Sequence, residues 1–176
     1  MEFPREQNRA LCEKYPFLIP TNRFSGMRIT EAAGGGFWPG DPEAVPEYNY
    51  EYTELDAMPR GWRISFGEQL CEELKQALIK DGLLDKYRIT QIKEKYGSLR
   101  WYANFDTDEI SKIIDKYTRL SYRTCVKCGA SATLITTGWI SPYCDICCPT
   151  NERVLPVEDY LAGIGQEDPV EECPDD

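Results

Sequence analysis

The sequence predicts an α+β fold, in which a small antiparallel sheet packs with two main helices and a cysteine-rich module follows. Three observations support this prediction: apolar residues at helical spacing over 61–83 and 106–123, an alternating segment between them, and two Cys-x2-Cys pairs after residue 124. We expect residues 1–123 to form the α+β domain with an irregular N-terminal loop region, 124–149 the module, and 150–176 a mostly flexible acidic tail.

The N-terminal third is predicted to contain little regular structure. A short helix is expected over residues 9–19 until Pro16 ends it, and the Gly- and Pro-rich segment 31–47 is typical of a long irregular loop. Residues 48–55 alternate tyrosines with polar side chains, which favours an edge strand. The same acidic, tyrosine-rich stretch could instead contact a partner protein, because tyrosine is enriched at binding hot spots.

Two amphipathic helices are predicted, one within 61–84 and one within 106–123. Each is expected to begin with a capping box, in which an N-cap side chain and a Glu three residues later satisfy free backbone N–H groups. The capping pairs are Ser65 with Glu68 and Asp106 with Glu109, and Gly82 is expected to end the first helix. The apolar stripes are Phe66, Leu70, Leu74, Ala77 and Leu78 in the first helix, and Ile110, Ile113, Ile114, Tyr117 and Leu120 in the second.

A basic hairpin is predicted over residues 87–105, with its turn at Tyr96-Gly97. One face of its second strand is formed by Leu99, Trp101, Ala103 and Phe105. Its candidate nucleic-acid-binding cations are Arg88, Lys93, Lys95 and Arg100. Aromatic residues are interleaved with them, and single-stranded nucleic acid needs cations beside exposed rings. A solvated basic face, or docking against the acidic segment 41–56, would explain the same pattern.

Four cysteines in the C-terminal third have the spacing of a metal site. Cys125-x2-Cys128 and Cys144-x2-Cys147 are separated by 15 residues, and the segment between them predicts a hairpin around Thr137-Gly138 that brings the pairs together. We therefore predict a four-cysteine zinc ribbon with one structural Zn²⁺, because four thiolates fill a tetrahedral shell. Cys148 is an alternative last ligand, but the Cys-x2-Cys turn favours Cys147.

Enzymatic chemistry is not indicated. The chain has no histidine, which excludes a Ser-His-Asp triad, a Cys-His pair and an HExxH site. A zinc-deaminase pattern would join Cys71-Glu72-Glu73 to Pro142-Tyr143-Cys144-Asp145-Ile146-Cys147. However, Tyr143 interrupts the Pro-Cys pair, and the first cysteine pair would have no role. We therefore expect a binding protein rather than an enzyme.

The location and the charge of the chain bear on its partners. The first residues lack a secretion-signal pattern, and no apolar run is long enough to span a membrane, so reduced thiols in the cytoplasm are expected. The net charge is −10 and is uneven, with −8 in residues 150–176 and no Lys or Arg between Ile29 and Pro59. This balance disfavours non-specific binding to a nucleic-acid backbone. The candidate partner-binding carboxylates are Glu43, Glu47, Glu51, Glu54 and Asp56.

The stretches "CEKYPFLIPTNRFSG", "GWRISFGEQLCEEL" and "YRITQIKEKYGSLRWY", together with the cysteine pairs, resemble small uncharacterised zinc-ribbon-bearing proteins of phages and prophages of Gram-positive bacteria. The resemblance brings no assigned activity, but it implies a context in which small acidic proteins inhibit host defences, CRISPR nucleases included. We therefore expect a zinc-stabilised, non-enzymatic protein in the host cytoplasm that inhibits a host protein, partly through acidic nucleic-acid mimicry of the anti-CRISPR type. The alternative is a nucleic-acid-binding zinc-ribbon protein that uses the hairpin 86–102.

Overall fold

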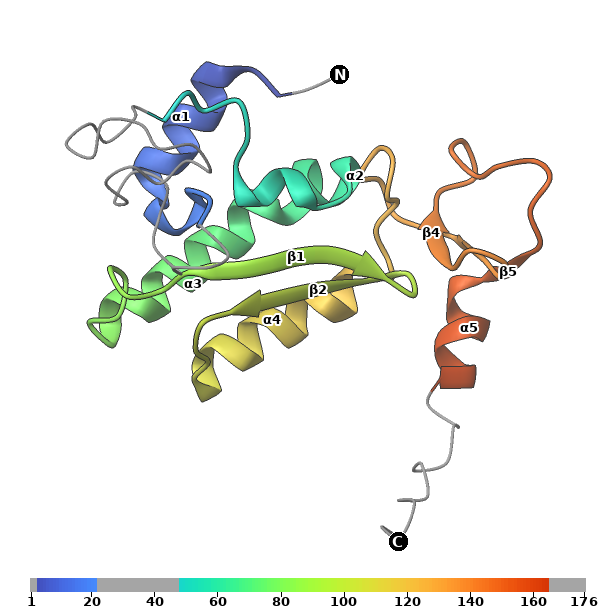
Figure 1. The fold of residues 1–176 in the computed structure, drawn as a ribbon. Helices are drawn as coiled ribbons and strands as arrows, with labels where there is room; N and C mark the ends of the chain where they lie inside the picture. Colours follow the sequence, from blue (N-terminus) through green and yellow to red (C-terminus); the bar gives the residue numbers. More distant parts are fainter. Residues whose placement is uncertain (1–2, 22–47, 165–176) are drawn as a thin grey trace, which may run out of the picture.

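The computed structural model describes residues 3–21 and 48–164 (Figure 1). The predicted loop 31–47, with Glu43 and Glu47, lies outside the described residues, as does the acidic end beyond Ile164. The N-terminal part contains α1 (Arg5–Lys14) and α2 (Arg60–Trp62), and the central part contains α3 (Glu68–Lys80), β1 (Ile89–Lys95), β2 (Ser98–Ala103) and α4 (Asp108–Ser121). The C-terminal part contains β3 (Leu134–Thr136), β4 (Ser141–Tyr143), β5 (Val154–Pro156) and α5 (Val157–Ile164).

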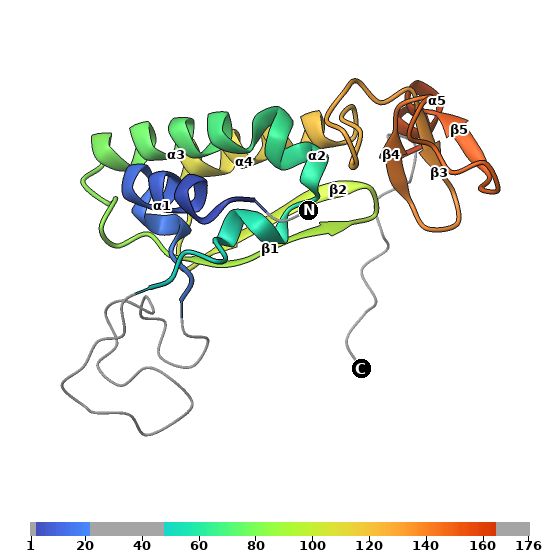
Figure 2. The same ribbon diagram turned by 90° about the horizontal axis from the view of Figure 1, so that it is seen from above.

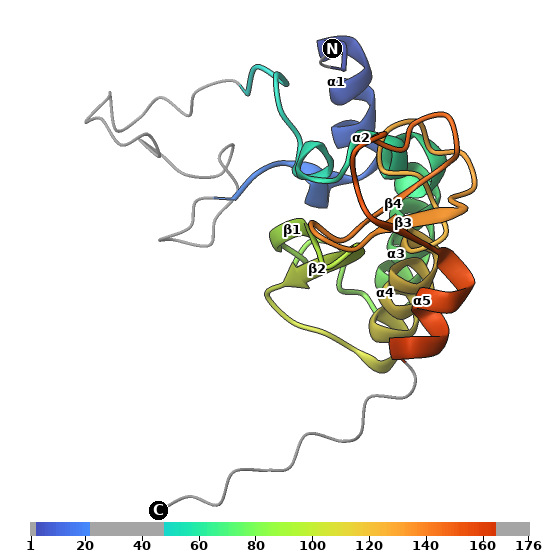
Figure 3. The same cartoon turned by 90° about the vertical axis from the view of Figure 1, so that its right-hand side faces the viewer.

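The α+β prediction is confirmed, including the hairpin between the two main helices. Helices α3 and α4 lie side by side along one face of the β1–β2 hairpin, as the view from above shows (Figure 2). One continuous core joins the N-terminal helix, the two main helices and the hairpin; its fully buried large side chains include Tyr15, Phe17, Trp62, Phe66, Leu74, Leu78, Tyr87, Leu99 and Tyr117. Viewed end-on, the helices cover one face of the hairpin, and no element of the described residues covers the other face away from the hairpin tip (Figure 3).

The hairpin turns where the sequence predicts. Tyr96 and Gly97 have φ values of 53° and 74°, the left-handed conformations that a two-residue turn between twisted strands requires. Leu99 and Trp101 are buried on the helix side, as expected, and Trp101 faces Ile92 across the strands. The free edge of β2 is closed by α4, because the Leu99 N–H donates to the hydroxyl of a serine near the end of that helix, Ser121.

The predicted strand over 48–55 is wrong. Tyr50 has a φ of 56°, which interrupts an extended chain, and its carbonyl accepts a hydrogen bond from the Asn8 side chain. A short 3₁₀ turn follows at Glu54–Ala57, closed by a capping box between Thr53 and Asp56. This local cap offers the backbone the hydrogen bonds that a neighbouring strand would otherwise supply, so the tyrosine alternation does not produce a strand.

The predicted helix starts are also corrected. The first main helix begins at Arg60 after Pro59 rather than at Ser65, which lies within a π-helical segment, Arg63–Gly67, that runs into α3. In α4 the N-cap is Thr107, whose side chain accepts from the Ile110 N–H, and not Asp106. Leu120, which was expected in the apolar stripe of α4, is 37% exposed. Gly82 ends α3 with a φ of 65°, as predicted.

The first helix differs from its prediction as well. It begins at Arg5 instead of residue 9, and it ends at Lys14, one residue before the Tyr15-Pro16 step, where a 3₁₀ turn over Pro16–Leu18 follows. The early start is consistent with Pro4 as the N-cap residue, since proline suits the first positions of a helix.

The cysteine module, which we define as residues 124–164, extends past the predicted boundary at 149. The expected hairpin forms between β3 and β4, but a third strand, β5, pairs with the other edge of β3 to give the order β4-β3-β5. Helix α5 then docks on the rest of the chain: Val157 is buried, and the ring of Tyr160 lies 6.2 Å from that of Tyr122. Residues 157–164, expected to belong to a mostly flexible tail, thus form a helix that contacts the rest of the chain.

Within residues 3–21 and 48–164, no helix is long and apolar enough to cross a membrane.

Candidate functional site

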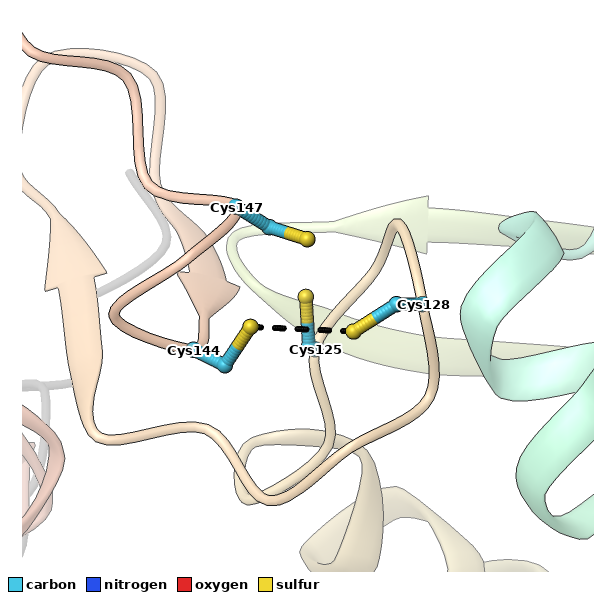
Figure 4. Close-up of side chains that lie close together, drawn as sticks. All are labelled: Cys125, Cys128, Cys144 and Cys147. Atoms are coloured by element: carbon cyan, nitrogen blue, oxygen red, sulfur yellow. Dashed lines mark hydrogen bonds between the residues drawn. The ribbon is translucent and has the colours of Figure 1, made fainter.

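The four predicted cysteines meet at one point (Figure 4). The Sγ atoms of Cys125, Cys128, Cys144 and Cys147 all lie within 4.8 Å of one another, and those of Cys128 and Cys144 are 3.6 Å apart. Tetrahedral zinc with Zn–S bonds of about 2.3 Å would place its sulfurs about 3.8 Å apart, whereas a disulfide would require about 2.05 Å. The thiols are free, so the geometry is compatible with a single metal ion.

Each cysteine pair is presented by a tight turn that the backbone closes. The N–H of Gly129 donates to the Cys125 carbonyl over 3.0 Å, and a φ of 81° at Gly129 lets the chain leave the turn. In the second pair, the N–H groups of Cys147 and Cys148 donate to the Cys144 carbonyl over 3.1 and 3.0 Å. Both turns direct two sulfurs to the same side, which is the arrangement that one ion needs.

The position of Cys148 explains why it is outside the cluster. Cys148 follows the second pair as Gly129 follows the first, so its backbone closes the turn while its side chain points to the Pro149 carbonyl. The deaminase arrangement is likewise not formed among the described residues. Cys71 is fully buried in the core, where burial raises the pKa of its thiol, and the sulfurs that join Cys144 are those of the first cysteine pair.

The thiols of Cys125 and Cys147 differ in how readily they ionise. Burial opposes the thiolate of Cys125, but hydrogen bonds from the backbone of Cys128, Cys144 and Lys127 lower its pKa to about 7. Hydrogen bonding with the Cys128 and Cys144 side chains raises the pKa of Cys147 to about 12. A thiolate can therefore form at Cys125 near neutral pH while Cys147 keeps its proton, and a cation bound at the cluster would favour the thiolate form of its ligands.

The first cysteine turn is fixed directly to the α+β core. The Gly61 N–H donates to the Val126 carbonyl over 2.8 Å, and the buried Trp62 indole donates to the Thr124 carbonyl over 2.8 Å. A Cβ on Gly61 would overlap the Cys125 carbonyl oxygen, so only glycine allows this approach. The first cysteine turn is therefore packed directly against the start of the first main helix.

The hairpin tip makes a second contact with the module. A Cβ on Gly97 would lie 3.1 Å from Cγ2 of Ile140 and 3.7 Å from Cδ of Pro142. Pro142 belongs to β4, and its carbonyl accepts from the N–H of Val126 in the first cysteine turn over 3.0 Å. The hairpin tip, the β3–β4 pair and the first cysteine turn therefore lie against one another at this end of the molecule (Figure 1).

The candidate acidic residues are only partly on the described surface, and two of them have intramolecular partners. Glu51 forms an ion pair with Arg5, and Asp56 forms one with the buried guanidinium of Arg63. Glu54 is half-buried in the 3₁₀ turn. Within the described part, the pairs of Glu51 and Asp56 do not involve the hairpin cations.

The structure places three of the four candidate cations on the outer hairpin face, which we define as Gln91, Lys93, Lys95, Arg100 and Tyr102 with Tyr96 at the turn. Lys93 lies directly opposite Arg100, and its ammonium is 5.4 Å from the centre of the Tyr102 ring. Lys95 lies in the same way 5.1 Å from the ring of Tyr96. The fourth cation differs: Arg88 donates to the backbone carbonyls of Asp85 and Tyr87 at the start of the hairpin.

The aromatic residues of the hairpin divide into two sets. Tyr96 and Tyr102 are 61% and 45% exposed, whereas Tyr87 and Trp101 are buried and joined by a hydrogen bond of 3.0 Å, so they cannot serve as a surface. Trp139, 76% exposed beside the hairpin tip, is a surface aromatic that sequence reasoning missed. Its position directly after the turn glycine of "TTGW" is the signal that could have indicated exposure.

Comparison with known proteins does not extend this description. No protein-family model, curated protein or solved structure matches the chain.

Proposed function

We propose that this protein is a zinc-stabilised, non-enzymatic protein that binds single-stranded nucleic acid on the outer hairpin face. The observation that carries the proposal is the row of cations with exposed tyrosine rings on a face that no described element covers away from the tip. Lysine and arginine reach phosphates, and exposed rings stack on bases, which is the pairing that single strands require.

Zinc is the metal that best suits the cysteine cluster. Four thiolates form a soft donor set, and the sulfur spacing fits a tetrahedral ion. Four sulfurs fill the shell, so the ion has no open position for a substrate or a reacting water. Its role is to hold the module together and, through the contacts at Gly61 and Trp62, to hold it against the core.

The net charge of the whole chain does not describe the region around the hairpin. The described residues contain 18 basic and 19 acidic side chains, a net charge of −1, whereas residues 22–47 and 165–176 together carry −8. The acidity that disfavours nucleic-acid binding is thus concentrated in sequence outside the α+β core.

The second candidate is the inhibition of a host protein, of the anti-defence type, through acidic mimicry of a nucleic acid. The distribution of charge favours it, since Glu43, Glu47 and the residues after 164 belong to the acidic segments. Against it, Glu51 and Asp56 already neutralise Arg5 and Arg63 and are poorly placed to imitate free phosphates. A defence nuclease with a cationic groove is the partner chemistry that this candidate requires.

Fluorescence anisotropy tests the proposal. The labelled ligands, each about 12 nucleotides long, are single-stranded DNA, single-stranded RNA and duplex DNA. The Lys93→Glu/Arg100→Glu variant should weaken single-strand binding about tenfold or more and should reduce the salt dependence of the dissociation constant. The matched control, Lys80→Glu/Lys112→Glu, changes the charge equally on exposed helical positions and should bind like the original protein.

Two outcomes would overturn the proposal. One is the absence of binding to any strand at micromolar protein. The other is an equal loss of binding in the hairpin variant and in the helix control, which would mean that net charge rather than the hairpin face governs the interaction. Salt-sensitive capture of a cationic nuclease by a protein that binds no strand would favour the second candidate instead.

A further inference from the structure

A pocket of about 310 Å³ lies where the hairpin tip meets the cysteine module. It is lined by Glu94, Lys95, Tyr96, Gly138, Trp139 and Ile140. One wall comes from the β1–β2 turn and the other from the turn between β3 and β4, so neither part of the protein forms the pocket alone. Figures 1 and 2 both place these two turns side by side.

Each wall is held in place by hydrogen bonds between a side chain and the backbone of the same turn. The Gly97 N–H donates to the Glu94 carboxylate over 2.7 Å, which secures the hairpin turn below Tyr96. In the other turn, the Thr136 hydroxyl donates to the Trp139 carbonyl and accepts from the Ser141 N–H over 3.1 Å. The two exposed rings are thus presented by ordered turns, which lowers the entropy lost when a ligand stacks on them.

The charges at the rim suit a nucleotide better than a purely apolar ligand. The Lys95 ammonium lies 5.1 Å from the Tyr96 ring and continues the row of cations that begins at Lys93 and Arg100. Glu94 disfavours a phosphate inside the pocket, but its carboxylate is an acceptor for the N–H groups of a base edge. The residues that line the pocket therefore include aromatic rings for a base, a hydrogen-bond acceptor for its edge and a cation for the adjoining phosphate.

We propose that this pocket receives one unpaired base of a strand that lies along the outer hairpin face, with the base stacked on Trp139 or Tyr96 and Lys95 beside the adjoining phosphate. This inference rests on the proposed function and adds to it a preference for unpaired bases over duplex. A base held in a duplex is not free to enter, because its faces are covered by its neighbours and its edge is paired.

The test compares two ligands on the full-length, zinc-loaded protein: a single strand of about 12 thymidines and the same backbone without its bases. Trp139→Ala should weaken binding of the intact strand roughly 5-fold to 100-fold, which is the range for one lost base stack. The same substitution should leave binding of the abasic strand unchanged, and the salt dependence should not move.

The second wall is tested with Tyr96→Asn, because asparagine tolerates the positive φ of this position and alanine does not tolerate it as well. It should reproduce the effect of Trp139→Ala on the intact strand. Ile146→Ala is the control, since Ile146 is a 94% exposed apolar residue that does not line the pocket, and it should bind like the original protein.

The outcomes separate this inference from the proposed function. If no strand binds, both are wrong. If the strands bind but Trp139→Ala and Tyr96→Asn have no effect, or affect intact and abasic strands equally, the base pocket is wrong and the hairpin proposal stands. If an apolar peptide binds the protein and loses this binding in Trp139→Ala, while the binding of strands does not depend on Trp139, the occupant of the pocket is a protein segment and the inference is overturned.

Discussion

The backbones of Gly61 and Gly129 lie in direct contact, and this contact joins the start of the first main helix to the first cysteine turn. A Cβ on Gly129 would lie 2.6 Å from the Gly61 carbonyl oxygen, and one on Gly61 would lie 2.7 Å from the Gly129 nitrogen. An added side chain at either position would therefore force the two backbones apart. The pair therefore couples the stability of the core to that of the cysteine cluster.

Gly61→Ala should destabilise the protein by about 3 kcal/mol or more, because the added methyl group meets rigid backbone on both sides. Gly163→Ala in α5 is the matched control: nothing lies within 4 Å of its added Cβ, and alanine favours a helix by about 1 kcal/mol over glycine. Urea unfolding of the two variants measures the difference. Equal stability of Gly61→Ala and the original protein would show that the contact at Gly129 can relax without cost.

The second prediction concerns which sulfurs bind the metal. Cys125→Ser and Cys144→Ser should each lose the ion, because three sulfurs leave the tetrahedral shell incomplete, whereas Cys148→Ser should keep it, since this thiol lies outside the cluster. Metal analysis of the purified proteins should give about one zinc per chain for the original protein and for Cys148→Ser. Loss of zinc from Cys148→Ser would instead assign a ligand role to that residue.

The sequence predicts those parts of the fold whose chemistry is local. The turn at Tyr96-Gly97 depends on two residues that must adopt positive φ, and the cysteine spacing of each pair closes a turn by its own backbone. Such features need no information about distant segments. The hairpin, the metal cluster and the end of α3 at Gly82 could therefore be placed correctly.

The errors arise where a distant segment decides the outcome. The Tyr50 carbonyl accepts a hydrogen bond from the Asn8 side chain, 42 residues away, which adds to the local cap at Thr53, and β5 pairs with an edge that β3 offers. The role of Gly61 depends on a turn 68 residues later in the chain, and its own neighbours contain no sign of that contact. Tertiary contacts of this kind override local preference.

The coupling between cluster and core leads to a third prediction, on hydrogen exchange after zinc is removed by a chelator. The amides of Gly61 and Cys125 donate to carbonyls in the first cysteine turn, so their exchange should accelerate when the turn loosens. The Leu99 amide, bonded to Ser121 within the α+β core, should remain protected and serves as the internal control. Uniform acceleration of all three amides would mean that zinc stabilises the whole chain as one unit.

The fourth prediction concerns the buried ion pair between Asp56 and Arg63. The Arg63 guanidinium contacts the Asp56 carboxylate and also donates to the Asn8 side chain. Asp56→Ala should destabilise the protein by about 3 kcal/mol, because it leaves this buried positive charge without its carboxylate partner. The double variant Asp56→Ala/Arg63→Met should recover part of this loss, since the uncompensated charge is then absent. Chemical unfolding of both proteins provides the comparison, and additive losses would show that the two side chains do not interact.

The last prediction is a pH dependence at the contact between α3 and α4. Burial opposes ionisation of the Glu73 carboxyl, but hydrogen bonds from Lys116 at 2.7 and 2.8 Å and from the Tyr117 hydroxyl at 2.8 Å lower its pKa below the ordinary value. A carboxyl whose pKa falls on folding stabilises the protein above its unfolded pKa and loses that contribution as the pH falls through its folded pKa. Glu73→Gln should therefore reduce the free energy of unfolding by roughly 1 kcal/mol at pH 7, and the difference should disappear in acid. Unfolding curves of the original protein and of Glu73→Gln between pH 7 and acid measure this difference in stability. Glu152→Gln on an exposed loop is the control for the loss of one negative charge. If the difference for Glu73→Gln does not change with pH, the carboxylate itself contributes nothing to the helix contact.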